Sequence, residues 1–123
     1  MSANPDPRAY KQALLIRRDL GMTRGKEIAQ GAHASMITLL EHREDPRMAA
    51  WLAGLFTKVA LSVPDEAEMT RIYEAAGEAG MIRSLVTDSG LTMFHGVPTR
   101  TVVAIGPDLN ARVDALCGHL KLR

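Results

Sequence analysis

The sequence predicts a three-layer α/β sandwich, in which a small mixed β-sheet of four to five strands carries helices on both faces. Two observations lead to this fold class. Short apolar runs alternate with helical patterns along the 123 residues, which are enough for one domain with a sizeable core. The last two apolar runs before the final helix are joined by a loop too short for a helix, which favours an antiparallel pair and therefore a mixed sheet.

The first half of the chain predicts a strand, two helices and a second strand. Residues 11–19 are a short apolar run bounded by charges, which is typical of a buried strand. Thr23 is in the position of an N-cap for a helix over 24–42. A short helix over 48–56 and a strand over 57–63 follow.

The helix over 24–42 has two stripes. Lys26, Gln30 and His33 align along one edge, at spacings of four and three residues, and small side chains beside them would let a ligand approach closely. The apolar face, typical of the side that an amphipathic helix turns to the core, consists of Ile28, Ala32, Met36, Leu39 and Leu40.

The second half of the chain predicts two more helices and two more strands. A helix begins after Pro64 with acidic residues in its first turn, where the helix dipole favours them, and Gly80 is placed to end it. The elements after it are a strand over 81–88, a loop over 89–100, a strand over 101–106 and a helix that opens at Pro107 and Asp108.

Composition narrows the class of protein. Residues 1–10 are polar and contain proline, so we expect a flexible lead before a single domain over 11–123. No apolar run suits a signal peptide or a membrane span. Cys117 stands alone, which excludes an intramolecular disulfide and fits a reducing compartment. We therefore expect a soluble, cytoplasmic protein with no membrane partner.

Charge is distributed unevenly along the chain. Residues 1–26 hold six basic and two acidic side chains, whereas residues 62–80 hold five acidic side chains and one basic. Such a layout would steer an anionic partner to one side of the molecule. A solvated surface with scattered charges is the alternative, and both interpretations stay open.

Two well-known kinds of site do not fit the sequence. A phosphate-binding P-loop needs four residues between its glycines and a Ser or Thr after its lysine. Here three residues separate Gly21 from Gly25, and Glu27 follows Lys26. A zinc site needs closely spaced ligands, which Cys117 and the four histidines do not offer. We expect no metal and no cofactor.

The loop after the expected third strand supplies a second group of polar side chains. Asp88 ends that strand and Thr92 follows it, and strand ends are where α/β sheets place functional groups. A carboxylate, a lysine and hydroxyls at one sheet edge would orient water and stabilise an oxyanion. The alternatives are a turn-capping Asp88, solvated Lys26 and Gln30, and a half-buried, hydrogen-bonded His33.

These motifs resemble a known family, the type 2 peptidyl-tRNA hydrolases. The segments that match, in order, between residues 11 and 122 are KQALLIRRDLGMTRGKEIAQGAHA, the tryptophan at Trp51, TKVALSVPDEAEM, SLVTDSGLT, TVVAIGP and GHLKL. The resemblance implies an α/β enzyme that cleaves the ester between a peptide and the 3′-terminal ribose of tRNA, without a metal and as a homodimer. Trp51 and Leu55 are candidate exposed apolar residues for the dimer surface.

The resemblance also implies a catalytic set, carried over position by position: Lys26, His33, Asp88, Thr92 and Thr101. Asp88 would orient water or a hydroxyl, directly or through Thr92. Lys26 would stabilise the oxyanion or a nearby phosphate. Gln30 matches the glutamine of the family's helix and, with His33, would support the geometry.

Three positions depart from the family's pattern. Gly31 stands where a cysteine is usual, Met93 stands where a polar residue usually follows the threonine, and the loop over 93–100 is one residue longer. Met93 would remove a hydrogen bond near the site. This leaves two alternative functions open, a non-catalytic tRNA- or ligand-binding protein on the same fold and a hydrolase of another acyl ester.

Basic side chains at one end of the sheet are expected to meet tRNA phosphates. Phosphate contacts supply affinity without reading bases, as an enzyme that accepts many tRNAs requires. Phe94 would either stack on the terminal adenosine or pack within its loop. Arg100 would either contact a phosphate or simply be exposed. The candidate substrate-binding residues are Gln30, Arg17, Arg18, Arg24 and Arg100.

Overall fold

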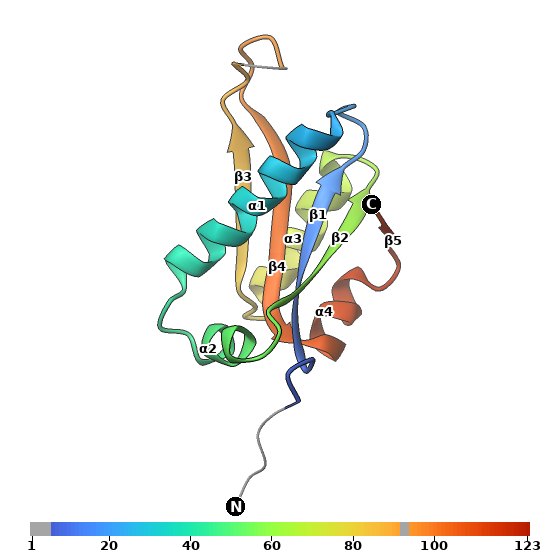
Figure 1. Ribbon diagram of the computed structural model, residues 1–123. Helices are drawn as coiled ribbons and strands as arrows, with labels where there is room; N and C mark the ends of the chain where they lie inside the picture. The colour runs from blue at the N-terminus through green and yellow to red at the C-terminus, as the bar shows by residue number, and fades with distance from the viewer. Residues whose placement is uncertain (1–5, 92–93) are drawn as a thin grey trace, which may run out of the picture.

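The computed structural model describes residues 6–91 and 94–123, and its helices and strands alternate along the chain largely as predicted (Figure 1). Residues 1–5 of the expected lead, and Thr92 and Met93, lie outside the described residues. The elements are β1 (Tyr10–Arg17), α1 (Arg24–Glu41), α2 (Pro46–Ala53), β2 (Thr57–Val63), α3 (Glu66–Glu78), β3 (Arg83–Asp88), β4 (Thr99–Leu109), α4 (Asn110–Cys117) and β5 (Lys121–Leu122).

The strands form one mixed sheet in the order β3-β4-β1-β2-β5. β1 and β2 are parallel, because α1 and α2 return the chain to the starting end of the sheet between them. The other neighbouring pairs are antiparallel, including β3 and β4, whose short connection predicts this pairing. The predicted mixed sheet is confirmed.

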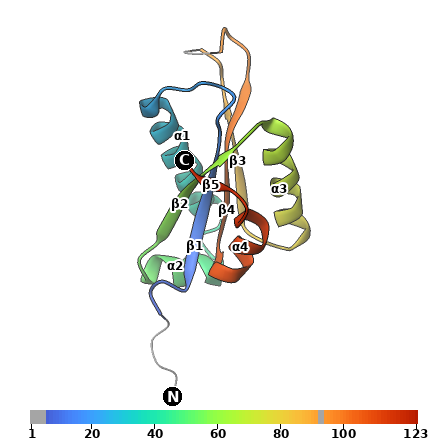
Figure 2. The ribbon, with the colours of Figure 1, turned by 90° about the vertical axis from the view of Figure 1, so that its right-hand side faces the viewer.

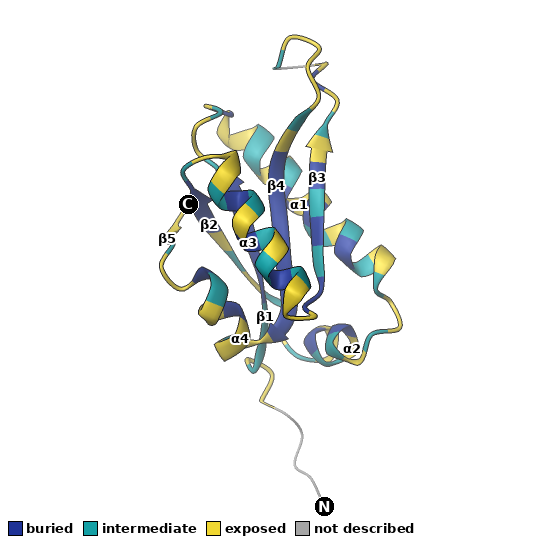
Figure 3. Cartoon of the chain, turned by 180° about the vertical axis from the view of Figure 1, so that it is seen from behind, coloured by how far each residue is buried: buried dark blue, intermediate teal, exposed yellow. Residues whose placement is uncertain are grey.

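Helices cover both faces of the sheet, which confirms the predicted three layers. In β1, Ala13 and Leu15 belong to the core under α3 and α4, whereas Leu14 and Ile16 belong to the core under α1. Figure 2 shows α1 on one side of the sheet and α3 and α4 on the other. Seen from behind, β4 is buried along most of its length, and the outer side of α3 is exposed (Figure 3).

The face that α1 turns to the sheet is not the predicted one. Its buried residues are Gly31, Ala34 and Thr38, and the Thr38 hydroxyl donates to the Ala34 carbonyl at 2.8 Å. By contrast, Ile28 and Met36 of the expected core face are 66% and 57% exposed. Small side chains let this face of the helix lie close to the sheet. The face that carries Ile28 and Met36 therefore points away from the sheet and is exposed.

Trp51 is buried, which makes the expectation of an exposed tryptophan wrong. Its side chain is 3% exposed, and the indole Nε1 donates to the Thr57 carbonyl at 2.9 Å. With its one polar atom satisfied, the ring can be buried between α2 and the sheet. Leu55 is 58% exposed, as expected.

β4 continues to Leu109, so Pro107 and Asp108 lie in the strand and do not open α4 as predicted. Asp108 pairs with Lys11 of β1, and the strand resumes this pairing after an irregularity in the register. A proline followed by an aspartate is typical of a helix start, but here the Asp108 carboxylate accepts from the backbone N–H of Leu109 and from a distant arginine.

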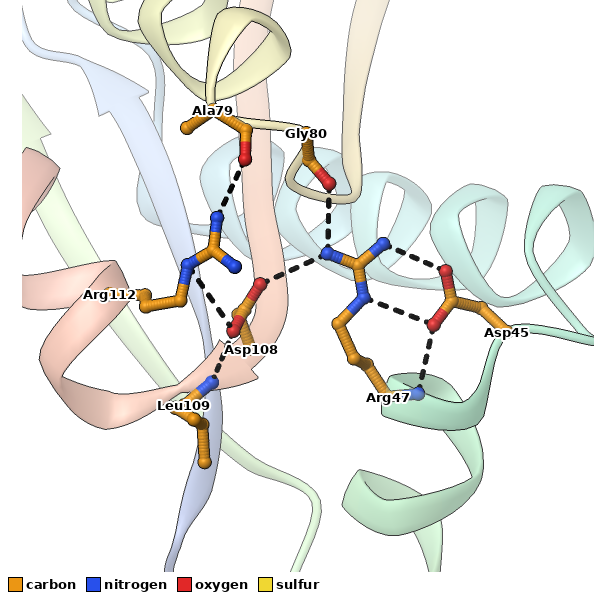
Figure 4. A network of polar contacts seen from close by, with 7 residues as sticks. All are labelled: Asp45, Arg47, Ala79, Gly80, Asp108, Leu109 and Arg112. Atoms are coloured by element: carbon orange, nitrogen blue, oxygen red, sulfur yellow. Dashed lines mark hydrogen bonds and ion pairs between the residues drawn. The ribbon is translucent and has the colours of Figure 1, made fainter.

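A charged network around Asp108 joins the sheet to α2 and α4 (Figure 4). Arg47 in α2 donates to Asp108 Oδ2 at 3.1 Å, to Asp45 Oδ2 at 2.9 Å and to the Gly80 carbonyl at 2.9 Å. Nε of Arg112 in α4 lies 3.8 Å from Asp108 Oδ1. Because Asp108 is only 2% exposed, these arginines supply the opposite charge that its burial requires.

The short strand β5 was not predicted. Leu122 pairs with Leu61 of β2, and Lys121 pairs with Ser62. Two residues are too few to produce a recognisable hydrophobic period, so sequence alone gives no signal for this strand.

Candidate active site

The start of α1 is fixed by the residues before it. Gly21 has a φ of 64°, a left-handed conformation that favours glycine. Thr23 is the N-cap, as predicted, and its Oγ1 accepts from the backbone N–H of Lys26 at 3.2 Å. Lys26 therefore projects from the first turn of the helix.

Lys26 and Asp88 meet across 62 residues of sequence. Lys26 Nζ donates to Asp88 Oδ1 at 2.9 Å, and the two side chains are 17% and 11% exposed. Asp88 is the last residue of β3, so the pair joins a helix start to a strand end. The sequence predicts both residues as catalytic, and the structure brings them together.

Gly90 shapes the loop that follows Asp88. Its backbone N–H donates to Asp88 Oδ2 at 2.9 Å, so the carboxylate also closes a local turn, as the capping alternative supposes. Gly90 has a φ of 85°, and a Cβ added there would collide with the backbone of Val97. The loop therefore needs glycine at this position to hold the carboxylate.

Asp88 is held in its ionised form. The Lys26 ammonium, followed by the Gly90 N–H, lowers the pKa of Asp88 below its ordinary value. An ionised carboxylate accepts hydrogen bonds and donates none. With one bond from Lys26 and one from Gly90, both oxygens keep acceptor capacity for a water molecule. The neighbouring ammonium offers positive charge to a developing oxyanion.

Gln30 and Thr101 form a second contact one turn further along α1. The Thr101 hydroxyl donates to Gln30 Oε1 at 2.5 Å, and Thr101 is fully buried in β4. Within the described residues, the Gln30 amide nitrogen has no hydrogen-bond partner. Both residues are predicted site residues, and their pairing leaves an N–H donor free for a ligand.

His33 lies on the same helix but outside these contacts. It is exposed, and it makes no hydrogen bond or ion pair with any described residue. The half-buried, hydrogen-bonded alternative for His33 is therefore wrong. Its catalytic role stays a prediction.

The predicted substrate-binding arginines differ in how many hydrogen bonds and ion pairs their side chains make within the protein. Arg17 donates to both carboxylate oxygens of Asp19, at 3.0 and 2.7 Å, and to the carbonyl of Arg100 at 2.9 Å. This contact with Asp19 raises the pKa of Arg17. The side chains of Arg18, Arg24 and Arg100 are exposed and make no hydrogen bond or ion pair within the described part of the chain.

Phe94 is half-buried and packs on the core under α1, beside Leu20 and Ile37. Its ring centroid lies 6.0 Å from Lys26 Nζ, at the outer limit of a cation–π contact. The loop-packing alternative for Phe94 thus has direct support. The predicted roles of Thr92 and Met93 fall outside the described residues.

An apolar groove among the described residues is separate from this site. It has a volume of about 380 Å³ and lies between the second half of α1 and α2, where Met36, Leu39, Trp51 and Phe56 line it. Neither Lys26 nor any residue paired with it lines the groove. We therefore do not assign it to the reaction.

Sequence reasoning missed one contact beside the site. Glu27 follows Lys26, and its carboxylate accepts from Arg123 Nη2 at 2.7 Å and from Nε at 3.0 and 3.2 Å. The sequence shows Glu27 only as a charge that opposes a phosphate. Its partner lies 96 residues away and has no local signal.

Two further findings concern the described ranges 6–91 and 94–123. No helix there combines the length and the hydropathy needed to cross a bilayer. No three His, Cys, Asp or Glu side chains there gather in a way that would hold a metal ion. Cys117 is 2% exposed, and burial raises its pKa to about 12.

Comparison with known proteins gives the family. The model of the family described as "Peptidyl-tRNA hydrolase PTH2" matches residues 10–123. The chain belongs to the type 2 peptidyl-tRNA hydrolase family. The peptidyl-tRNA hydrolases of Methanocaldococcus jannaschii and Aeropyrum pernix are 40% and 42% identical to it. These matches cover 91% and 92% of this chain, and 98% and 95% of the relatives.

This type 2 hydrolase has peptidyl-tRNA as its substrate and cleaves the ester that joins peptide to tRNA. A solved structure of a protein of unknown function from Agrobacterium tumefaciens matches with a TM-score of 0.64 at 15% identity. The match covers 94% of this chain and 98% of that one, and it bears on the fold alone. The family assignment confirms the resemblance found in the sequence.

Proposed function

We propose that this chain cleaves peptidyl-tRNA at the Lys26–Asp88 pair. The observation that supports it is the 2.9 Å contact between the Lys26 ammonium and an ionised Asp88, at a largely shielded point where α1 begins and β3 ends. Ester hydrolysis needs a polarised water and a stabilised oxyanion, and these two side chains offer one group for each.

In the proposed reaction, a water donates a hydrogen bond to Asp88 and attacks the ester carbon. The carbonyl oxygen gains negative charge, which the ammonium of Lys26 stabilises. The bond to the ribose oxygen then breaks, and one proton of the water ends on that oxygen. The products are a free tRNA hydroxyl and a peptide carboxylic acid, which releases the second proton of the water to solvent as it ionises.

The neighbouring residues take supporting roles in this proposal. Gln30, oriented by Thr101, donates its free N–H to the substrate. Thr92, which lies outside the described residues, keeps its predicted role in orienting the water. His33, exposed on the same helix, is proposed to contact the leaving nucleoside.

The exposed arginines are proposed to bind phosphates of the tRNA. Arg18 and Arg24 flank the start of α1, and Arg100 lies near the start of β4. Arg17 acts differently, since its guanidinium ties Asp19 to the Arg100 carbonyl and thereby positions that strand. This division assigns the affinity for tRNA to the exposed arginines, which have no ion pair within the described residues to give up when a phosphate binds.

The test is the release of tRNA from an N-blocked aminoacyl-tRNA. Asp88→Asn and Lys26→Ala should each lower kcat at least about 100-fold, while tRNA binding by Asp88→Asn is undiminished. The matched control is Asp114→Asn, because Asp114 forms another lysine–aspartate pair, 2.6 Å from Lys11. The control should keep kcat within about twofold. Wild-type turnover by Asp88→Asn would contradict the proposed site.

We propose, in addition, that the protein is a homodimer that works in the cytoplasm, where translation supplies its substrate. Exposed large apolar side chains on α1, α2 and the turn after α2 support the dimer, because burial against a second copy would remove them from water. These side chains make up the exposed apolar surface, namely Ile28, Met36, Leu40, Leu52, Leu55 and Phe56. Residues 11–123 are proposed to form one domain with 1–10 as its lead, of which Tyr10 already pairs with Leu109 of β4.

A further inference from the structure

A carboxylate follows, in sequence, the lysine that the proposed site depends on, and it stands in the same first turn of α1. Glu27 is the next residue of α1, and its side chain is only 12% exposed. In the first turn of a helix, a carboxylate is favoured by the helix dipole. For a protein that must bring tRNA phosphates to this point, the same charge is unfavourable, because little water is present to screen it.

Arg123 compensates this charge. Its guanidinium contacts both oxygens of Glu27, with Nη2 at 2.7 Å from Oε2 and Nε at 3.0 Å from Oε1. This fork geometry is among the strongest that arginine forms with a carboxylate. The contact also raises the pKa of Arg123, as expected for a guanidinium bonded to an anion.

The backbone fixes Arg123 in this position. The residue directly follows β5, and its N–H donates to the Ala60 carbonyl of β2 at 2.9 Å. The chain end marked C lies near the start of α1 in both Figure 1 and Figure 2. β5 therefore delivers the guanidinium to the turn of α1 that carries Lys26.

We propose that Arg123 is a positioning residue for substrate binding, which neutralises Glu27 so that the charge of Glu27 does not oppose tRNA phosphates at the start of α1. The inference rests on the proposed site at Lys26. It explains why a segment of two paired residues is kept at the sheet edge: it carries the counter-charge for the first turn of α1.

The test is a double-mutant cycle on Glu27 and Arg123, measured as kcat and KM for N-blocked aminoacyl-tRNA. Arg123→Ala should raise KM about fivefold at low ionic strength and keep kcat within about twofold, because it leaves Glu27 uncompensated. Adding Glu27→Gln to Arg123→Ala should return KM to within about twofold of the wild type. Arg123→Lys, which keeps the charge, should also stay near the wild-type KM.

A structural role for Arg123 predicts a different pattern. If the arginine only docked β5, Glu27→Gln and Arg123→Ala would break the same contact, and combining them would restore nothing. The matched control is Arg71→Ala, which removes the same charge from an exposed pair with Glu68 on α3. This control should leave KM unchanged. A fivefold rise in its KM would show that net charge alone matters, and would overturn the proposal.

Glu27→Gln alone keeps the proposal testable even if Arg123→Ala does not fold. It leaves Arg123 as a free positive charge, so KM should fall, by about twofold at low salt. An unchanged or raised KM would overturn the proposal. Failure of the proposed site appears separately, as wild-type turnover by Asp88→Asn, because the cycle leaves Lys26 and Asp88 in place.

Discussion

Asp88 is the residue whose charge decides most about the site. Its pKa is lowered in the folded protein by the Lys26 ammonium, whereas the unfolded chain has the ordinary value of about 3.9. As the pH falls, the unfolded chain therefore takes up the proton first. The stabilisation from the ion pair is complete above the ordinary value, and it is lost as the pH falls through the folded value.

This linkage gives a prediction for stability. The difference in unfolding free energy between the wild type and Asp88→Asn should be constant from about pH 7 to about pH 5, and should shrink below about pH 4. Urea unfolding at a series of pH values measures it. A difference that shrinks already between about pH 7 and pH 5 would show that Asp88 is not held as a carboxylate.

The individual site residues were predictable from sequence, but their contacts were not. Helical spacing alone places Lys26 and Gln30 on one stripe. The partner of each lies on another strand, 62 and 71 residues away, and no local pattern connects them. Its place at a strand end indicated Asp88, family resemblance supplied Thr101, and the fold supplies the pairing.

At the scale of elements, the start of α1 and the strand β2 followed their local signals, whereas the start of α4 did not. The N-cap at Thr23 and the parallel strand β2 appear where the sequence puts them. The buried face of α1 did not follow, because periodicity shows which side of a helix is apolar and not whether that side faces the sheet. Here Gly31 and Ala34 face the sheet, and the apolar side is left exposed.

The network around Asp108 leads to a prediction at this scale. Arg47→Ala removes a donor from a carboxylate that is 2% exposed, so it should cost about 3 kcal/mol of unfolding free energy. Arg71→Ala breaks only an exposed ion pair with Glu68 and should cost less than about 1 kcal/mol. Urea unfolding measures both. Equal losses of unfolding free energy in the two variants would mean that the burial of Asp108 does not strengthen its dependence on Arg47.

At the scale of the whole molecule, the fold class was within reach of the sequence. Alternating apolar and helical segments require a covered sheet, and the short link between β3 and β4 requires an antiparallel pair. Which apolar side chains are buried and which are exposed could not be predicted from the sequence. Trp51 fills space under α2, while Met36 and Phe56 remain exposed, and only packing distinguishes the two situations.

The exposed apolar surface predicts the oligomeric state. The wild type should have a mass in solution of twice the 13.4 kDa of one chain. Met36→Glu, which puts a charge on a 57% exposed position of this surface, should yield monomers. Sedimentation equilibrium measures the mass. Val97→Glu, a 60% exposed position off this surface, is the matched control and should stay dimeric, whereas a monomeric wild type would exclude the dimer.

The short length of β5 has a consequence for aggregation. In the described chain, β5 pairs with only two residues of β2, so much of the β2 edge is open to the addition of a foreign strand. Lys58 lies on this open stretch, with its ammonium 5.0 Å from the Trp51 ring and 4.8 Å from the Phe56 ring. A second edge stacked against this one would bring two such ammonium groups together. Lys58 therefore places a positive charge on the open edge, which disfavours pairing with a foreign strand.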